Sequence, residues 1–398
     1  MTRGSMREYL DAVRGRYLKA TRPEKGRILD EFTRVTGRHR KAAIRLLAHG
    51  YKEAIPGQRG RPRQYGPAVV DALKVAWETS DHMCSRRLQP FLPELLMVLE
   101  RHEELTLEGE VKDQLCRMSA ATIDRRLKPY RQRGGRRPFS TTKPGSLLKA
   151  AIPIRTFADW DDPGPGFIEV DLVAHCGENT EGFYLNTLSA VDIPTGWVEC
   201  QGVWGKGQER VGSAVHHLGQ RLPFPLLGLD SDNGGEFINH HLYAYCQRKG
   251  ITFTRSRPYK KNDSAHVEQK NWSVVRRLVG YDRYSSKAAL TQLNHLYELV
   301  RLYGNFFQPV MQLQYKTRQG AKVRKVYDRA RTPYQRVLES GVLSLPQQEA
   351  LARQYQGLNP VVLLARIKQS LEGLWALADT KTNKASVTVS SEAMTALR

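Results

Sequence analysis

The chain has 398 residues, of which 40% are hydrophobic, so it is long enough for two or three folded domains. Its formal charge of +22 points to a polyanionic partner, and nucleic acid is the first candidate. The sequence has no apolar run long enough to span a membrane and no apolar signal-peptide core at its start. We therefore expect an intracellular protein without membrane contact. The five cysteines are scattered, which argues against a disulfide framework and against a zinc ribbon.

The positive charge is concentrated towards the two ends of the chain. Between residues 165 and 285 there are 13 Lys and Arg and 13 Asp and Glu, so the whole excess lies outside this segment. This pattern indicates a neutral central block with acidic residues, held against a polyanion by basic flanking domains. The alternative is that the Lys and Arg side chains only keep the protein soluble.

Residues 1–55 are predicted to form a helix-turn-helix DNA-binding domain. Apolar residues recur at helical spacing up to Val35, Thr36-Gly37 interrupts the pattern, and a second helix is expected from there to Leu47. The second helix of such a motif enters the major groove. Its expected DNA contacts are Arg38, Arg40, Lys41 and Arg45. A plain helical hairpin with a solvated basic face is the alternative.

Residues 56–66 are predicted to be an AT-hook-like basic linker. Glycine and proline between the arginines forbid a helix, so the segment should be extended and slim enough for the minor groove. The arginines expected to contact DNA are Arg59, Arg61 and Arg63. An ordinary short basic linker is the competing interpretation.

Residues 67–130 are predicted to form a second helix-turn-helix DNA-binding domain. Ser119 is a suitable N-cap for its last helix, which would bury Ile123 and Leu127. The exposed side of that helix would contact DNA through Thr122, Arg125 and Arg126. Residues 131–165, where arginines alternate with Gly and Pro, are predicted to be a basic linker along the phosphates.

Residues 166–285 are predicted to form a mixed α/β domain. Three antiparallel strands are expected at 167–175, 184–191 and 197–203, followed by a helix at 209–222 and a strand ending at Asp232. A helix at 237–249, a strand at 251–254 and a helix holding Glu268 complete the series. This order is that of an RNase H-like mixed sheet.

Three acids of this domain are the predicted catalytic residues and metal ligands: Asp171, Asp232 and Glu268. Two aspartates and a glutamate supply the oxygen ligands that two Mg²⁺ ions, or Mn²⁺ in their place, require in one active site. Three lysines near the trio are expected to contact DNA phosphates, with solvated surface as the alternative: Lys260, Lys261 and Lys270.

Other acids lie near the trio in the sequence. Glu169 and Asp230 are two residues from Asp171 and Asp232, so each shares a strand face with its neighbour. They would either support the ligands or be exposed charges. Glu236 is expected to be a favourable charge in the first turn of a helix.

The segments 171–175 (Asp-Leu-Val-Ala-His) and 232–237 (Asp-Asn-Gly-Gly-Glu-Phe), with Glu268 following Asp232 after 35 intervening residues, carry a resemblance. They resemble the DDE signature of retroviral integrases and of bacterial insertion-sequence transposases. The similarity covers residues 166–283. The two helix-turn-helix units around a Gly-Arg-Pro-Arg linker are similar to the arrangement in mariner-type transposases. There is no His-His-Cys-Cys module, so the resemblance does not imply zinc.

The resemblance implies a DDE transposase of a bacterial insertion sequence with a retroviral-integrase-like catalytic core. Such an enzyme binds double-stranded DNA at the terminal inverted repeats of its element, cleaves the 3′ ends and joins them to target DNA. It works as a dimer or a larger assembly and is cytoplasmic and nucleoid-associated.

Residues 286–398 are predicted to be a basic, mostly helical C-terminal region with a polar tail. Two other functions remain open from the residues alone. One is a non-catalytic DNA-binding regulator derived from a transposase. The other is an RNase H-like nuclease or resolvase, which would use the same metals without strand transfer.

Overall fold

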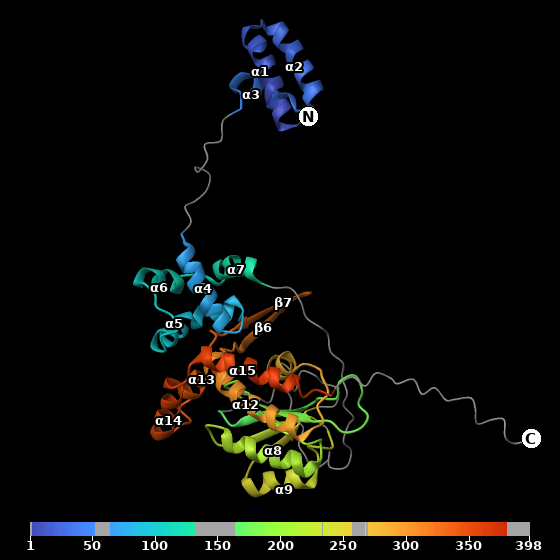
Figure 1. Cartoon of the computed structure of the whole chain (residues 1–398), viewed down its shortest axis with the longest axis vertical. Helices are drawn as coiled ribbons and strands as arrows, with labels where there is room; N and C mark the ends of the chain where they lie inside the picture. Colours follow the sequence, from blue (N-terminus) through green and yellow to red (C-terminus); the bar gives the residue numbers. More distant parts are fainter. Residues whose placement is uncertain are drawn as a thin grey trace, which may run out of the picture. The chain divides into compact units, whose positions relative to one another are not determined.

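The computed structural model describes residues 2–51, 64–131, 164–232, 234–256, 267 and 270–379. The chain forms two compact units, Met1–Gln64 and Tyr65–Arg398 (Figure 1). Most of the AT-hook-like linker, nearly all of the basic linker 131–165 and the polar tail lie outside the described residues, so these predictions stay untested. No helix in the described ranges is long and apolar enough to cross a membrane.

The described residues of the first unit form three helices: α1 (Arg3–Lys19), α2 (Arg22–Thr36) and α3 (Arg40–His49). Each helix contributes a buried side chain to a shared core, Leu10 from α1, Phe32 from α2 and Leu47 from α3. The pair α2–α3 corresponds to the predicted helices. The prediction did not include α1, which completes the core of the pair.

The turn between α2 and α3 differs in one respect from the prediction. α2 ends at Gly37, whose φ of 66° lies in the left-handed region that favours glycine. The His39 side chain then accepts a hydrogen bond from the Lys41 amide, so α3 begins at Arg40. Arg38 therefore precedes the second helix and is not part of it.

The second unit begins with four helices: α4 (Pro67–Thr79), α5 (Ser85–Arg101), α6 (Gly109–Cys116) and α7 (Ala120–Leu127). Leu73, Leu92 and Ile123 are fully buried among them. The Ser119 hydroxyl accepts a hydrogen bond from the Thr122 amide, so Ser119 caps α7 as predicted.

A five-stranded sheet follows: β1 (Phe167–Ala174), β2 (Asn186–Asp192), β3 (Val198–Val203), β4 (Gly228–Ser231) and β5 (Thr252–Arg255). The strand order is β3-β2-β1-β4-β5. β1, β2 and β3 pair in antiparallel fashion, whereas β4 runs parallel to both β1 and β5. This mixed α/β sheet fits the predicted RNase H-like core.

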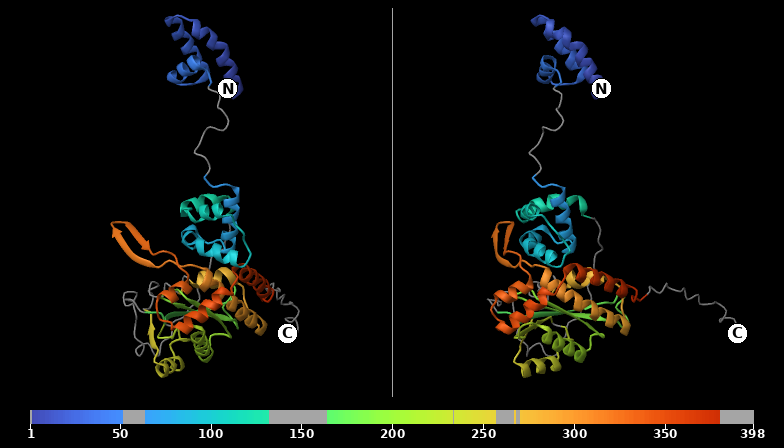
Figure 2. Two further views of the ribbon diagram at one scale, coloured as in Figure 1. Left: turned by 90° about the vertical axis from the view of Figure 1, so that its left-hand side faces the viewer. Right: turned by 60° about the vertical axis from the view of Figure 1, so that its left-hand side comes forward.

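Helices cover both faces of the sheet (Figures 1 and 2). α8 (Gln208–Arg221) and α9 (His240–Lys249) pack on one face, around Leu188 and Leu229. On the other face lie α12 (Lys287–Phe307), a π-helical segment (Asn271–Arg276) and α11 (Arg277–Val279).

α9 begins three residues later than predicted, because the Asn239 side chain caps it by accepting a hydrogen bond from the Leu242 amide.

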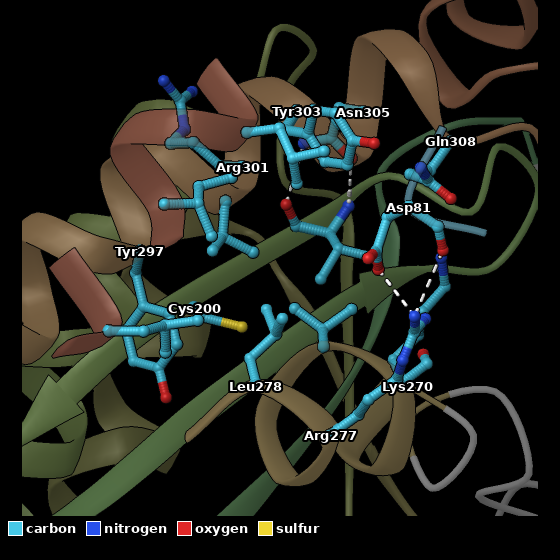
Figure 3. A pocket seen from close by; sticks show the side chains of 18 of the residues that line it. Asp81, Cys200, Lys270, Arg277, Leu278, Tyr297, Arg301, Tyr303, Asn305 and Gln308 are labelled. Carbon is cyan, nitrogen blue, oxygen red and sulfur yellow. Dashed lines mark hydrogen bonds and ion pairs between the residues drawn. The ribbon is translucent and has the colours of Figure 1, made fainter. Parts of the chain in front are cut away.

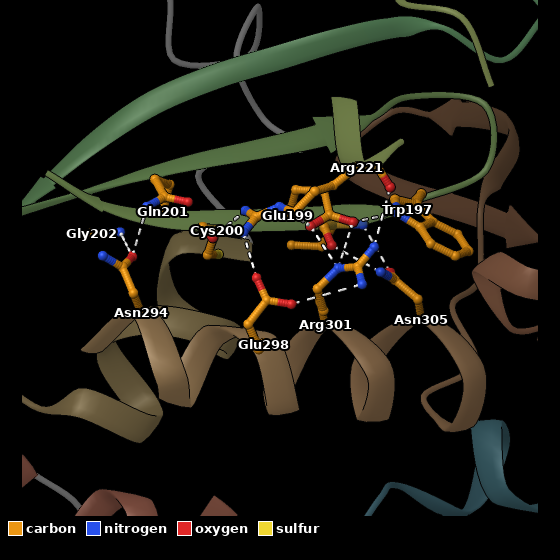
Figure 4. Close-up of polar contacts among 11 residues, drawn as sticks. Trp197, Glu199, Cys200, Gln201, Gly202, Arg221, Asn294, Glu298, Arg301 and Asn305 are labelled. Atoms are coloured by element: carbon orange, nitrogen blue, oxygen red, sulfur yellow. Dashed lines mark hydrogen bonds and ion pairs between the residues drawn. The ribbon is translucent and has the colours of Figure 1, made fainter. Parts of the chain in front are cut away.

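α12 also covers β3, an edge strand of the sheet (Figure 4). The Asn305 side chain accepts from the amide of Val198 and donates to its carbonyl, at 2.8 and 2.9 Å. Arg301 donates to both carboxylate oxygens of the buried Glu199. These contacts satisfy polar groups of the edge strand that another chain would otherwise pair with.

After α12, the described part of the C-terminal region contains a hairpin, β6 (Leu313–Gln319) and β7 (Lys322–Tyr327), and three helices, α13 (Pro333–Glu339), α14 (Leu345–Gln356) and α15 (Pro360–Trp375). The hairpin was not predicted. α15 packs on α12, so the C-terminal helices belong to the same unit as the sheet.

The turn between α4 and α5 docks helices α4–α7, the helical domain, on the part of the chain that contains the five-stranded sheet, the sheet domain. Asp81 and His82 adopt positive φ angles of 52° and 57°, which are uncommon for residues other than glycine. Side chains of the sheet domain donate to three successive carbonyl oxygens of this turn: Tyr303 to Thr79 at 2.6 Å, Gln308 to Ser80 at 3.0 Å and Arg277 to Asp81 at 3.2 Å.

Candidate active site

One of the predicted metal ligands, Asp171, lies within β1, and another, Asp232, directly follows the neighbouring strand β4. The last residues paired between β1 and β4 are Val170 and Ser231. One residue further in the same register, Asp171 follows Val170 and Asp232 follows Ser231. Because paired residues of neighbouring strands share a face, this register places Asp171 and Asp232 on the same face of the sheet.

The carboxylate of Asp171 is held on both oxygens. The Leu172 amide donates to Oδ1 at 2.8 Å, and the Asn271 side-chain amide donates to Oδ2 at 2.6 Å. The Asn271 carbonyl oxygen in turn accepts a hydrogen bond from the Ser189 hydroxyl on β2. Asn271 therefore links the π-helical segment to Asp171 and to the sheet. This residue was not among those predicted from the sequence.

Asp232 lies at the start of a tight turn. Its Oδ1 accepts a hydrogen bond from the Gly234 amide at 2.9 Å. Burial raises the pKa of the Asp232 carboxyl above its usual range. Burial also raises the pKa of Glu236, and the charge of Asp232 adds to that rise. The two carboxylates are therefore close together in a partly desolvated place.

The role predicted for Glu236 is wrong. α9 begins at His240, so Glu236 is not in its first turn. A Cβ added at Gly234 would lie 2.7 Å from Glu236 Cδ and 2.9 Å from Asp232 Oδ1, which shows that both carboxylates contact the same glycine. Glu236 is thus a further acid beside Asp232.

Glu169 and Asp230 are buried at 1% and 2% exposure, so neither is an exposed charge. Oε2 of Glu169 accepts a hydrogen bond from the Val267 amide at 2.9 Å, and Asp230 accepts one from the Thr254 hydroxyl. Glu169 therefore fixes the backbone one residue before Glu268. Both acids support the site from inside the sheet domain.

Glu268 itself lies outside the described residues, so the convergence of the trio stays a prediction. Within the described ranges, no three His, Cys, Asp or Glu side chains form a group that could hold a metal ion. The donor chemistry nevertheless fits a hard divalent cation, because Asp171 within β1 and Asp232 just after β4 offer carboxylate oxygens. The raised pKa values of Asp232 and Glu236 fit as well, since a bound cation would favour both ionised forms.

No protein-family model matches the chain. A protein of Sinorhizobium fredii (strain NBRC 101917 / NGR234), named uncharacterized protein y4rM, is 47% identical over 322 residues. The match covers 80% of this chain and 91% of y4rM. The chain belongs to the y4rM family.

Among solved structures, the catalytic core domain of BIV integrase is similar to the y4rM-family chain at 23% sequence identity. The likeness covers 44% of this chain and 96% of that chain, with a TM-score of 0.31.

The predicted DNA contacts of the first unit lie at and before α3 of the y4rM-family chain. Arg38, Lys41 and Arg45 are exposed. Arg40 is exposed as well and forms an ion pair with Asp30 of α2. Arg59, Arg61 and Arg63 lie outside the described residues, as do Lys260 and Lys261.

On α7, Arg125 is exposed, whereas Thr122 and Arg126 are half-buried. Arg125 donates a hydrogen bond to the Thr122 hydroxyl at 3.2 Å, so the two predicted contacts form one polar surface. Asp124 on the same helix accepts from the Ser85 hydroxyl at 2.7 Å and pairs with Arg131.

Lys270 lines a cavity of about 190 Å³ between the π-helical segment, α12, α15 and the α4–α5 turn (Figure 3). The same cavity contains the ion pair between Arg277 and Asp81, at 2.7 Å. Burial lowers the pKa of Lys270 to about 8. In this conformation Lys270 is therefore the least suited of the described candidates to contact a DNA phosphate.

Proposed function

We propose that this y4rM-family protein is a DDE transposase. It binds the terminal inverted repeats of its element, hydrolyses the phosphodiester bond at each 3′ end and joins the free 3′-hydroxyl to target DNA. The observation that carries this proposal is the register of β1 and β4: Asp171 and Asp232 each follow the last pair of residues that the two strands share, so both side chains are expected on one face of the sheet.

Asp171, Asp232 and Glu268 would hold Mg²⁺ ions, two in each active site. When bound, these ions lower the pKa of the attacking water or 3′-hydroxyl and stabilise the leaving oxygen. The protein's contribution is to fix the ligands. Asn271 orients Asp171, the Gly234 amide orients Asp232, and Glu169 holds the backbone next to Glu268.

The basic domains would bring DNA to this site. Exposed cations on α3 (Arg40, Lys41 and Arg45) and on α7 (Arg125) would supply attraction for phosphates, and each is the last α-helix described in its predicted domain, as in a helix-turn-helix motif. Two element ends must be joined in concert, so the working assembly is at least a dimer.

The experiment is a cleavage assay on duplex DNA taken from the two flanks of the gene, where the inverted repeats would lie. We expect strand-specific cleavage at the repeat ends in Mg²⁺ or Mn²⁺, and none after the metal is removed with EDTA. Specific binding without cleavage in any divalent metal would instead favour a non-catalytic regulator. Cleavage of branched DNA or of RNA–DNA hybrids alone would favour a nuclease or resolvase.

The substitution Gly234→Ala tests the geometry of the turn. The added methyl group would lie 2.7 Å from Glu236 Cδ and 2.9 Å from Asp232 Oδ1, so one of these carboxylates must move. We expect cleavage to fall by about 10- to 100-fold, the usual effect of disturbing the groups that orient a metal ligand.

Gly212→Ala on α8 is the matched control, because nothing lies within 4 Å of a Cβ there. Its cleavage rate should equal that of the wild type, and its thermal stability should be unchanged or slightly higher. Equal cleavage rates for the two alanine variants would contradict the proposed role of the turn.

A further inference from the structure

The hairpin formed by β6 and β7 is a free-standing two-stranded ribbon. Its register runs from Tyr315 opposite Val326 to Gln319 opposite Lys322, and it pairs with no other described strand. Gly320 at its tip has a φ of 58°. Both views in Figure 2 show the ribbon projecting from the sheet domain beside the α4–α7 helices. A two-stranded ribbon is only marginally stable alone in water, so a partner for it is expected.

The base of the ribbon is fixed rigidly. Asp328 Oδ1 accepts from the Gln312 amide at 2.7 Å, and Asp328 Oδ2 forms an ion pair with Arg336 at 2.6 Å. The side chains of Asp328 and Arg336 are only 9% and 6% exposed. Gln312 Nε2 also donates to the Ile193 carbonyl in the turn after β2. The arm is therefore exposed while its attachment to the domain is buried and paired.

The exposed part of the ribbon, the arm, is basic on both of its strands. Residues 313–327 include five Lys and Arg and no Asp or Glu, so no acid within the arm can neutralise its charge. Tyr315 and Tyr327 are 55% and 42% exposed beside these cations. Cations with interspersed exposed aromatic residues are typical of a nucleic-acid-binding surface. Three of the cations have side chains that are exposed to solvent: Arg318, Arg324 and Lys325.

The dimensions of the ribbon select the form of nucleic acid. The major groove of B-DNA, about 12 Å wide, admits a two-stranded β-ribbon. Strands of six and seven residues reach roughly 20 Å at about 3.3 Å per residue, which is longer than the groove is deep. The base of the ribbon also borders α5, where Arg329 donates to the Pro90 carbonyl. A duplex contacted by α7 would therefore lie close to the ribbon.

We propose that the β6–β7 hairpin is a DNA-binding ribbon that enters the major groove of duplex DNA. Arg318, Arg324 and Lys325 contact phosphates on the two sides of the groove, and the tyrosines lie against the sugars and base edges. This inference rests on the proposed function, which supplies DNA as the class of ligand. It deepens that function by adding a DNA contact outside both helical domains.

The test is equilibrium binding of the full chain to a short labelled duplex over a series of salt concentrations. The variant carries Arg318→Ser, Arg324→Ser and Lys325→Ser. We expect affinity at moderate salt to fall by about 10- to 100-fold and the slope of log affinity against log salt to decrease by about 2 to 3. The matched control, Arg248→Ser, Lys249→Ser and Arg353→Ser, removes the same charge from exposed positions on α9 and α14 and should keep the wild-type slope.

Two further measurements separate the alternatives. The first distinguishes a lost contact with the groove from a misfolded ribbon, and the second distinguishes it from a loss of general attraction for phosphates. The conservative variant, Arg318→Lys, Arg324→Lys and Lys325→Arg, should restore most of the affinity, which a misfolded arm would not allow. A single-stranded oligonucleotide of the same sequence should show a smaller loss with the serine variant, since it has no groove.

An unchanged salt slope in the serine variant, an equal loss in the control, or an equal loss for single-stranded DNA would overturn the proposal. The proposed function fails separately, by the absence of metal-dependent cleavage in the wild type. A ribbon that binds duplex DNA would survive that result.

Discussion

The substitution Asp232→Asn is expected to reduce Mg²⁺-dependent cleavage of DNA ends by about a thousandfold or more, since it would remove one of the proposed metal ligands. Asparagine has the shape of aspartate, so its carbonyl oxygen can still accept the hydrogen bond from the Gly234 amide. The turn should therefore keep its structure. What is lost is the negative charge, and with it most of the affinity for a divalent cation.

DNA binding by the Asp232→Asn variant should remain close to that of the wild type, because the proposed phosphate contacts lie in the basic domains and not at the acids. Asp113→Asn on the exposed side of α6 makes the same change of charge and should cleave normally. Both variants would be compared by initial rates of end cleavage and by duplex affinity in the same buffer. Wild-type cleavage by Asp232→Asn would mean that the site lies elsewhere.

Replacing Glu199 with alanine is expected to lower the free energy of unfolding by about 3–5 kcal/mol, the usual result of breaking a buried ion pair. Glu199 is fully buried, and burial raises the pKa of its carboxyl while Arg301 and Arg221 lower it. Its oxygens accept hydrogen bonds from Arg301 Nε and from the Trp197 indole, both at 2.9 Å (Figure 4). Without the carboxylate, Arg301 would remain largely buried at the sheet edge without its main partner.

The matched control is Glu298→Ala, which removes another carboxylate from the same network. Glu298 is 50% exposed and pairs with Arg221 at 2.7 Å. Its loss should cost at most about 1 kcal/mol, because water replaces an exposed partner. Urea denaturation of both variants measures the difference. Similar losses for the two would show that α12 is held to β3 by apolar packing rather than by the buried pair.

The sequence was sufficient to locate Asp171 and Asp232 because local patterns determine their positions. The β1 strand is readable from its apolar residues, and an Asp-Asn-Gly turn after a short apolar run marks the end of β4. The pairing of β1 with β4 then follows from the order of the elements in a mixed sheet. The position of Glu268 was predicted in the same way, although the structure does not describe it.

Asn271 could not be predicted, because its role depends on a π-helical turn that changes which residues face the sheet. The position of Glu236 depended on where α9 begins, and the cap at Asn239 moved that start beyond Glu236. The β6–β7 hairpin was missed as well. Its alternating basic and apolar residues suit a ribbon, but the bulge near Leu313 and the lack of a buried face weaken the usual strand pattern.

The most direct measurement of the central claim is strand transfer. A short duplex carrying the terminal repeat, with one strand labelled and already ending at the cleaved 3′-hydroxyl, would be incubated with the full chain, Mg²⁺ and an unlabelled plasmid. We predict that label becomes covalently joined to the plasmid, that joining needs the 3′-hydroxyl and that Asp232→Asn abolishes it. Metal-dependent cleavage of an uncut repeat, measured in parallel, without any joined product from the pre-cut duplex would contradict the transposase assignment and would identify the protein as a nuclease.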